Sequence, residues 1–314
     1  ANTILDRPTA DLNALWSNES FHPVCEFLDQ NVSSGSPVQE TPLFRYTVQA
    51  GSSCFAVQVL IYSDQSFELS LTDITQSEQT KKLKQQMSNN ITHELRTPVS
   101  SIRGYLETIM ECAGLNEQRK NDFLRKAHAQ AVRLTDLIRD VALITKAEEA
   151  PEALPLETID VSRMVEDIAD ELRGGMEQAG MSFKQLIPPT TTLTGNYSLV
   201  YAIFRNLMEN SIRYAGQGTK MCAELYNEDK EFLYFSFRDT GCGVPEEHLP
   251  RLFERFYRVT EGRTRDCGGT GLGLSIVRNA VLCHSGEISV RNRKEGGLEI
   301  LFCLKKNHKG GLRN

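Results

Sequence analysis

The chain has 314 residues, which predicts two or three domains at about 100–200 residues per domain. Hydrophobic residues make up 40% and charged residues 24%, as in ordinary globular proteins, which excludes a mainly disordered chain. With 35 basic and 41 acidic residues the net charge is −6, which excludes a strongly basic nucleic-acid surface over the whole chain, so we expect no nucleic-acid partner.

The first 76 residues predict a small mixed domain. Alternating apolar side chains predict strands at 43–48, 54–62 and 67–72, separated by turn residues. This pattern is typical of an antiparallel meander. Short helices are expected at 10–16 and 23–30.

Residues 77–147 are almost free of Gly and Pro and carry two apolar stripes with helical spacing. The first stripe runs from Leu83 to Ile109 and the second from Phe123 to Ile144, with a break at 113–116. Two long helices joined by a short loop form an antiparallel hairpin, which cannot bury both stripes by itself. Pairing with a second copy would complete a four-helix bundle, so a homodimer is expected.

After a Glu-, Ala- and Pro-rich stretch at 147–159, which predicts a linker, helical and strand patterns alternate. Helices are expected at 161–177, 197–215 and 270–284. Strands are expected at 181–187, 219–226, 231–239, 286–291 and 297–304. Helices packed on one face of a mixed sheet is the simplest arrangement.

The sequence HELRTP at 93–98 lies on the first long helix. At 100° per residue, His93 points away from the apolar stripe into solvent, and Thr97 shares its face. Glu94 could accept the imidazole proton or hold its tautomer, and Pro98 should bend the helix. A solvated surface histidine is the alternative, but these neighbours favour a reactive nucleophile.

Three later segments have the chemistry of a nucleotide site. Asn206 and Asn210 lie one helical turn apart, where two amide oxygens could converge on a hard cation; an exposed polar stripe is the alternative. Asp239 ends a strand before two glycines and could accept an exocyclic amine, or simply cap a turn. The run GGTGLGL opens a helix whose free N–H groups favour anions, although it could be a plain loop.

Together these motifs resemble those of the sensor histidine kinases of two-component systems. HELRTP (93–98) resembles the phospho-acceptor motif. NLMENSIRYA (206–215), DTGCGVP (239–245), RLFERFYRV (251–259) and GGTGLGLSIV (268–277) follow in the order of the family's N, G1, F and G2 boxes.

The resemblance implies ATP and Mg²⁺ as cofactors and assigns the site residues. The implied ATP-binding set is Asn206, Asn210, Arg213, Tyr214, Asp239, Gly241, Gly243, Thr270, Gly271, Leu272 and Gly273. Asn210, supported by Asn206, would bind the metal, and Asp239 would read adenine. Arg258 would face the γ-phosphate, and residues 260–268 would form a mobile lid.

The implied reaction is autophosphorylation of His93, aided by Glu94, followed by phosphotransfer to an aspartate of a partner response regulator. Thr97 would serve the reverse dephosphorylation of that partner. Separately, the three strands of the first domain, the last of which runs into Asp73-Ile74-Thr75 before a helix, resemble the end of a PAS sensor domain. The expected fold is therefore an α+β multidomain protein: a PAS-like sensor domain at 1–76, a dimerisation and phosphotransfer hairpin at 77–150, and an α/β-sandwich ATP-binding domain at 151–314. We expect a cytoplasmic portion of a parent protein tethered to the cell membrane.

Two alternatives remain open: an ATPase or chaperone with the same nucleotide fold, and a catalytically silent dimeric scaffold. No catalytic role is expected for His248 or for His284, which stands at a helix end where a cation is favourable. Arg251 and Arg255 are expected to be solvated.

Overall fold

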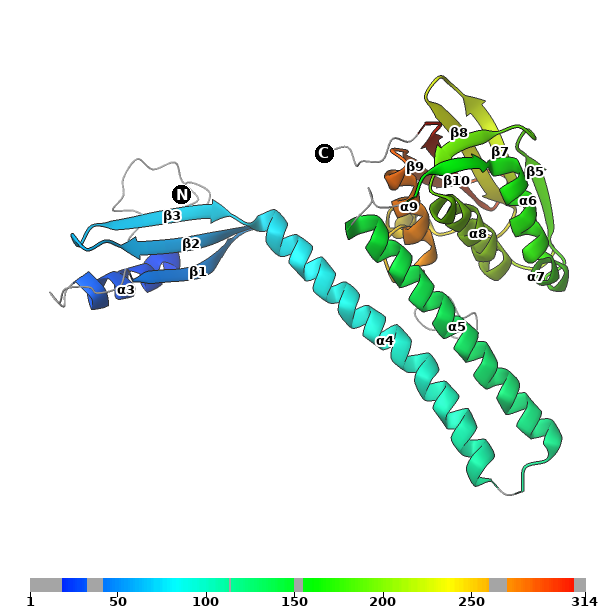
Figure 1. Ribbon diagram of the computed structural model, residues 1–314, viewed down its shortest axis with the longest axis horizontal. Coiled ribbons are helices and arrows are strands. Elements are labelled where there is room, and N and C mark those ends of the chain that lie inside the picture. The colour runs from blue at the N-terminus through cyan, green and yellow to red at the C-terminus, as the bar shows by residue number, and fades with distance from the viewer. Residues whose placement is uncertain (1–18, 33–41, 113, 150–154, 260–269, 308–314) are drawn as a thin grey trace. The chain divides into compact units, whose positions relative to one another are not determined.

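The computed structural model describes residues 19–32, 42–112, 114–149, 155–259 and 270–307. The chain divides into two compact units, Ala1–Asn89 and Asn90–Asn314 (Figure 1). The helix expected at 10–16 and the lid expected at 260–268 lie outside the described residues.

The first unit contains a three-stranded antiparallel sheet with one helix on one face. The strands β1 (Leu43–Ala50), β2 (Ser53–Ile61) and β3 (Phe67–Asp73) lie in the order β1-β2-β3, which confirms the expected meander. A 3-10 turn (Glu19–Phe21) leads into α3 (His22–Val32). Phe21 of the turn and Val24 of α3 are fully buried against the sheet. Alternate residues of β2 therefore form the core of this unit.

The sheet leads directly into the long helix α4 (Thr75–Glu111). Asp73 Oδ1 accepts hydrogen bonds from the Thr75 backbone N–H at 2.9 Å and from its hydroxyl at 2.6 Å, so Asp73 caps the helix start. Thr75 Oγ1 also accepts the backbone N–H of Cys54 at 2.8 Å. These bonds fix the start of α4 against β2.

α4 and α5 (Glu117–Glu149) form the expected hairpin, and the break falls at 112–116. α4 continues through the buried Pro98. Many apolar side chains of the two helices remain exposed: Leu83, Val99, Leu106, Met110, Leu124, Val132 and Ile138. Among the described helices, none is long and apolar enough to cross a membrane.

The C-terminal part of the second unit is built on a five-stranded mixed sheet. Its strands are β5 (Ser182–Leu186), β7 (Lys220–Glu228), β8 (Phe232–Asp239), β10 (Leu298–Lys305) and β9 (Ile288–Asn292), in that spatial order. β5 pairs with β7 in parallel, and the other pairs are antiparallel.

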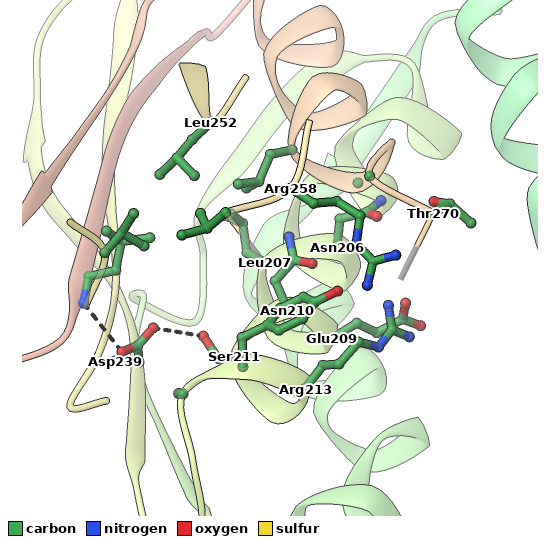
Figure 2. A pocket seen from close by; sticks show the side chains of 18 of the residues that line it. Asn206, Leu207, Glu209, Asn210, Ser211, Arg213, Asp239, Leu252, Arg258 and Thr270 are labelled. Carbon is green, nitrogen blue, oxygen red and sulfur yellow. Dashed lines mark hydrogen bonds between the residues drawn. The ribbon is translucent and has the colours of Figure 1, made fainter. Parts of the chain in front are cut away.

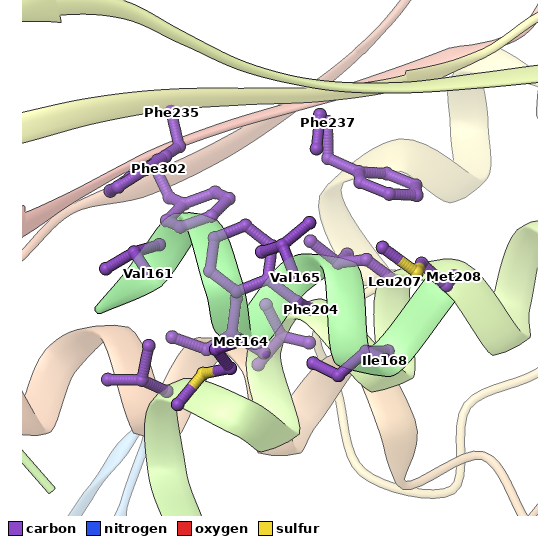
Figure 3. Close-up of a cluster of buried hydrophobic side chains, with 14 of the residues drawn as sticks. Val161, Met164, Val165, Ile168, Phe204, Leu207, Met208, Phe235, Phe237 and Phe302 are labelled. Carbon is purple, nitrogen blue, oxygen red and sulfur yellow. The ribbon is translucent and has the colours of Figure 1, made fainter. Parts of the chain in front are cut away.

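Three helices pack on one face of this sheet, as expected. They are α6 (Val161–Glu171), α8 (Tyr197–Tyr214) and α9 (Gly273–Cys283). Figure 3 shows Phe204 of α8 beneath the sheet. Its ring contacts the rings of Phe235 and Phe302 edge-on, with the ring centroids 5.6 and 5.8 Å apart, respectively. The apolar face of α6 packs beside Phe204 in the same core, which fixes the position of α8 against the sheet.

The structure differs from the sequence-based expectations at three places. The helix expected at 161–177 ends at Glu171, and a separate short helix, α7 (Arg173–Gln178), follows Leu172. Gly174 and Gly175, in the first turn of α7, weaken the helix where it is interrupted. The stretch expected to be a linker at 147–159 is partly α5 and partly β4 (Glu157–Asp160), which pairs with β6 (Thr192–Gly195). The last expected helix begins at Gly273 rather than at residue 270.

His284 at the end of α9 is not the exposed cation that its position suggested. Its side chain is only 1% exposed, and its Nε2 accepts the backbone N–H of Asn196 at 3.1 Å. Nδ1 then carries the proton and donates to the Ala280 carbonyl at 2.7 Å. Because Asn196 caps the start of α8, the neutral ring ties the beginning of α8 to the end of α9.

Candidate active site

A cavity of about 710 Å³ opens between α8, the start of α9, the ends of the central strands and α5. This volume suits a ligand of nucleotide size. Most of the expected ATP-binding residues line it: Asn206, Asn210, Arg213, Tyr214, Asp239, Gly243, Thr270, Gly271 and Gly273. Arg258, which was expected at the γ-phosphate, lines it as well. Gly241 and Leu272 are not among the lining residues, and the Leu272 side chain is fully buried.

Asp239 lies at the deep end of the cavity, where β8 ends. Its Oδ2 accepts the Ser211 hydroxyl at 3.1 Å (Figure 2). Its Oδ1 accepts the backbone N–H groups of Gly241 at 2.9 Å and Leu298 at 3.3 Å. A carboxylate has about four acceptor positions, so these three donors leave one for a ligand. The carboxylate is held rigidly at 9% exposure and can receive one further donor from the cavity.

Asn206 and Asn210 lie on the face of α8 that meets the start of α9. The Asn206 amide nitrogen donates to the Ala202 carbonyl at 2.8 Å, which turns Oδ1 toward Gly273. A Cβ atom at Gly273 would come within 2.7 Å of that oxygen, so only glycine allows this approach. The two asparagines and the first N–H groups of α9 therefore meet at one wall of the cavity.

Cationic side chains line the same part of the cavity. Figure 2 shows Arg258 extending toward Asn206 and Asn210, with Thr270 beside it and Arg213 below. The Thr270 hydroxyl accepts the Leu272 backbone N–H at 3.2 Å, which orders the turn before α9. Arginine side chains beside a helix N-terminus favour phosphate groups.

The helix α5 supplies the remaining wall, through Ala129, Val132, Arg133, Asp136 and Asp140. Burial raises the pKa of Asp140 to about 6, and the negative charges of Glu209 and Asp136 add to the rise. These acidic groups were not expected to be near the site, because nothing in the sequence shows which residues of α5 face the nucleotide domain.

The residues expected on the acceptor helix lie on α4, outside the lining of the cavity. His93 is exposed to solvent, as expected, and the Thr97 hydroxyl donates to the His93 carbonyl at 3.3 Å. The Glu94 carboxylate pairs with Arg133 of α5, with Nη2 and Oε2 3.6 Å apart. The hairpin thus fixes Glu94 on one side of an accessible imidazole.

Two groups of residues near the site were missed or misjudged from the sequence. Ser211 holds Asp239 from a buried position of α8, and a polar residue in that apolar stripe is a signal that could have revealed it. Arg255 is half-buried, and burial together with the nearby Arg278 lowers its pKa, so it is not simply solvated. Arg251, by contrast, is exposed as expected, and its guanidinium carbon lies 4.1 Å from the centroid of the Tyr257 ring.

Comparisons with known proteins match both the helical hairpin and the C-terminal α/β domain to protein families. Residues 83–150 match the family model of the His Kinase A (phospho-acceptor) domain. Residues 195–308 match the family model of the histidine kinase-, DNA gyrase B- and HSP90-like ATPases. The first matched region contains His93 and the α5 wall of the cavity, and the second contains most of the other residues that line the cavity.

The similar proteins and solved structures are histidine kinases. The sensor histidine kinase WalK of Bacillus subtilis is 30% identical over 233 residues, which cover 74% of this chain and 38% of WalK. Among solved structures, Acinetobacter baumannii histidine kinase AdeS aligns with a TM-score of 0.54 at 22% identity, over 69% of this chain and 98% of AdeS. Histidine kinase ThkA, solved in complex with response regulator TrrA, aligns with a TM-score of 0.53 at 17% identity, over 93% of this chain and 85% of that one. At these identities the two structures support the fold alone.

Proposed function

Because the chain carries the phospho-acceptor and ATP-binding domains of a sensor histidine kinase, we propose that it transfers the γ-phosphoryl group of ATP to His93. The observation that carries this proposal is the pairing of two features in one chain: an exposed histidine on the hairpin, and a nucleotide-sized cavity lined by the expected residues. The match covers 38% of WalK, so activity and partners are proposed for this chain rather than taken over from its relative.

The adenine end of ATP would lie at Asp239. One acceptor position of the carboxylate is left by its three protein donors, and the exocyclic amine of adenine would fill it. Apolar side chains beside it, including Leu207, Phe237 and Ile300, suit a flat base.

The phosphate end would lie between the two asparagines and the start of α9. Asn206 and Asn210 offer amide oxygens of the kind that Mg²⁺ accepts, and Asn206 Oδ1 already faces the α9 start. When bound, Mg²⁺ would neutralise part of the phosphate charge. Arg258 and Arg213 would hold the phosphate oxygens, and Arg258 would stabilise the charge that develops on the γ-phosphoryl group.

In the transfer step, a nitrogen of the His93 imidazole attacks the γ-phosphorus. The new N–P bond forms as the bond to the β,γ-bridging oxygen breaks, and ADP leaves with that electron pair. Glu94 would accept or orient the imidazole proton, which requires a carboxylate fixed beside the ring. Its pairing with Arg133 supports that role.

The exposed apolar residues of the hairpin support a second copy of the chain as the partner that covers them. Two such hairpins would bury the stripes in a four-helix bundle. A response regulator is the proposed acceptor of the phosphoryl group from His93, in line with the ThkA–TrrA complex. Thr97, one turn from His93, would orient water in the reverse dephosphorylation.

The first unit is proposed to be a PAS-like sensor module. Its three-stranded meander, capped junction and direct connection to α4 support a signal input on the hairpin. A cytoplasmic location beside a membrane tether stays a prediction of the resemblance.

Labelling from γ-labelled ATP tests the main proposal. The wild-type chain should acquire a label that is lost in acid and stable in alkali, and His93→Gln should abolish it. His128→Gln is the matched control, because His128 is another exposed histidine on the hairpin, and its label should equal that of the wild type. Undiminished labelling of His93→Gln would show that another residue is the acceptor. ATP turnover without any phosphoprotein would favour the ATPase alternative, and binding without turnover would favour the silent scaffold.

A further inference from the structure

Tyr257 is held from two sides by side chains of the preceding 3-10 helix (Glu246–Arg251). His248 Nδ1 and the Tyr257 hydroxyl are 2.5 Å apart, a short hydrogen bond. The Arg251 guanidinium lies 4.1 Å from the centroid of the same ring and also binds the Glu254 carboxylate at 3.1 Å. An aromatic ring with these two contacts has little freedom to turn.

The backbone before Tyr257 is strained. Phe256 has a φ of +62°, in the left-handed region that bulky residues rarely adopt. Its N–H donates to the Gly271 carbonyl at 2.8 Å. A Cβ atom at Gly271 would come within 2.8 Å of the Phe256 Cα atom, so the two backbones are packed as closely as glycine permits. Such a conformation persists only where the surrounding contacts enforce it.

This strained segment leads directly into the nucleotide cavity. Tyr257 and Arg258 both line the cavity, as do Thr270 and Gly271 on the opposite side of the Phe256–Gly271 hydrogen bond. Figure 2 shows the Arg258 side chain directed toward Asn206 and Asn210. The direction of Arg258 therefore depends on how the preceding residue is held.

We propose that His248 and Arg251 are positioning residues, which hold the ring of Tyr257 and thereby set the direction in which Arg258 meets the γ-phosphate of ATP. This inference rests on the proposed function, because it assumes the role given there to Arg258. His248 itself does not contact the nucleotide. Through Tyr257 and Arg258, His248 affects binding of the γ-phosphate of ATP. It does not affect binding of the adenine ring at Asp239.

The difference between ATP and ADP binding measures this role. Calorimetry on the full chain with Mg²⁺ should show that His248→Ala weakens ATP binding about tenfold, the effect of losing about one charge-assisted hydrogen bond, while ADP affinity stays at the wild-type value. Tyr257→Phe should have the same effect, and the two changes together should have no more than either alone. His248→Asn, which places an amide group where Nδ1 lies, should restore most of the ATP affinity.

Two further variants complete the test. Glu247→Ala is the control, because Glu247 is exposed and lies 3.6 Å from the other ring nitrogen of His248; it should bind both nucleotides normally. In an Arg258→Ala background, His248→Ala should cause no further loss of ATP affinity, because Arg258 is the group through which it acts.

The inference is overturned if His248→Ala leaves ATP affinity unchanged, weakens ADP and ATP equally, or keeps its full effect without Arg258. It is also overturned if Arg258→Ala binds ATP as tightly as the wild type does. None of these results bears on whether His93 is labelled, so failure here and failure of the proposed kinase function are distinguishable.

Discussion

Asp239 shows how a single carboxylate can be prepared for one ligand atom. Three donors from three different segments fix it, and two of these are backbone N–H groups that side-chain motion cannot withdraw. The entropic cost of fixing the carboxylate therefore arises when the chain folds and does not reduce the affinity for the ligand. A ligand amine meets an acceptor that is already in place.

Asp239→Asn tests this arrangement at the residue scale. The amide keeps the size of the side chain but replaces one acceptor oxygen by a donor, so nucleotide affinity should fall by about 10- to 100-fold, the effect of losing a charge-assisted hydrogen bond. ADP calorimetry measures the loss. Asp229→Asn, which changes a carboxylate at the β7–β8 turn, is the control and should bind ADP normally. Equal affinities of Asp239→Asn and the wild type would contradict the adenine-binding role.

The sequence predicts some of these site residues and not others for a physical reason. Asn206 and Asn210 lie on one helix, so their spacing alone places them together. Leu298 contributes only its backbone N–H, from 59 residues beyond Asp239, and no side-chain pattern can mark such a donor. The His248–Tyr257 contact likewise depends on a 3-10 helix that sequence periodicity does not predict.

At the scale of elements, the contact between α5 and α8 carries an unfavourable charge. Asp140 of α5 has a pKa raised to about 6 by burial and by Glu209 and Asp136, while Arg205 and Arg139 partly offset the rise. Because the folded-state pKa lies above the ordinary value of 3.8, the stability that protonated Asp140 provides is complete below pH 3.8. It is lost as the pH rises through about 6.

Asp140→Asn should therefore stabilise the protein at neutral pH. We expect a gain of about 1 kcal/mol in the free energy of unfolding at pH 7.5, after discounting the pKa shift for partial exposure, and almost none at pH 4. Denaturant unfolding at the two pH values measures it. Asp167→Asn is the control, since Asp167 lies at an exposed position of α6 and is not among the charges that act on Asp140, and it should change little. An equal gain at both pH values would show that the carboxylate charge is not the cause.

Long, strongly periodic elements are predicted well, and the two shortest strands are not. The apolar spacing repeats over several turns in α4, α5 and α8. By contrast, β4 and β6 have four residues each, which is too short for an alternation of apolar and polar residues to identify a strand. The pairing of β4 with β6 places the start of α6 and is visible only once the chain is folded.

For the whole molecule, the exposed apolar residues of the hairpin are the basis of the proposed homodimer. Ile138 is 55% exposed on α5, and a charge there should weaken a dimer built on the hairpin. Sedimentation at micromolar concentrations should show a wild-type dimer and a mainly monomeric Ile138→Glu variant. Arg139→Gln changes the neighbouring exposed position and should remain dimeric. A monomeric wild-type chain would contradict the proposed four-helix bundle.

We propose that the two domains of this chain act together to place phosphate on one histidine. The most direct test is to incubate the chain with ATP and Mg²⁺ at alkaline pH and to locate the phosphoryl group by mass spectrometry of its peptides. We expect one phosphoryl group on the peptide that contains His93, which acid treatment removes. A phosphoryl group on any other residue, or ATP hydrolysis with an unmodified His93 peptide, would contradict it.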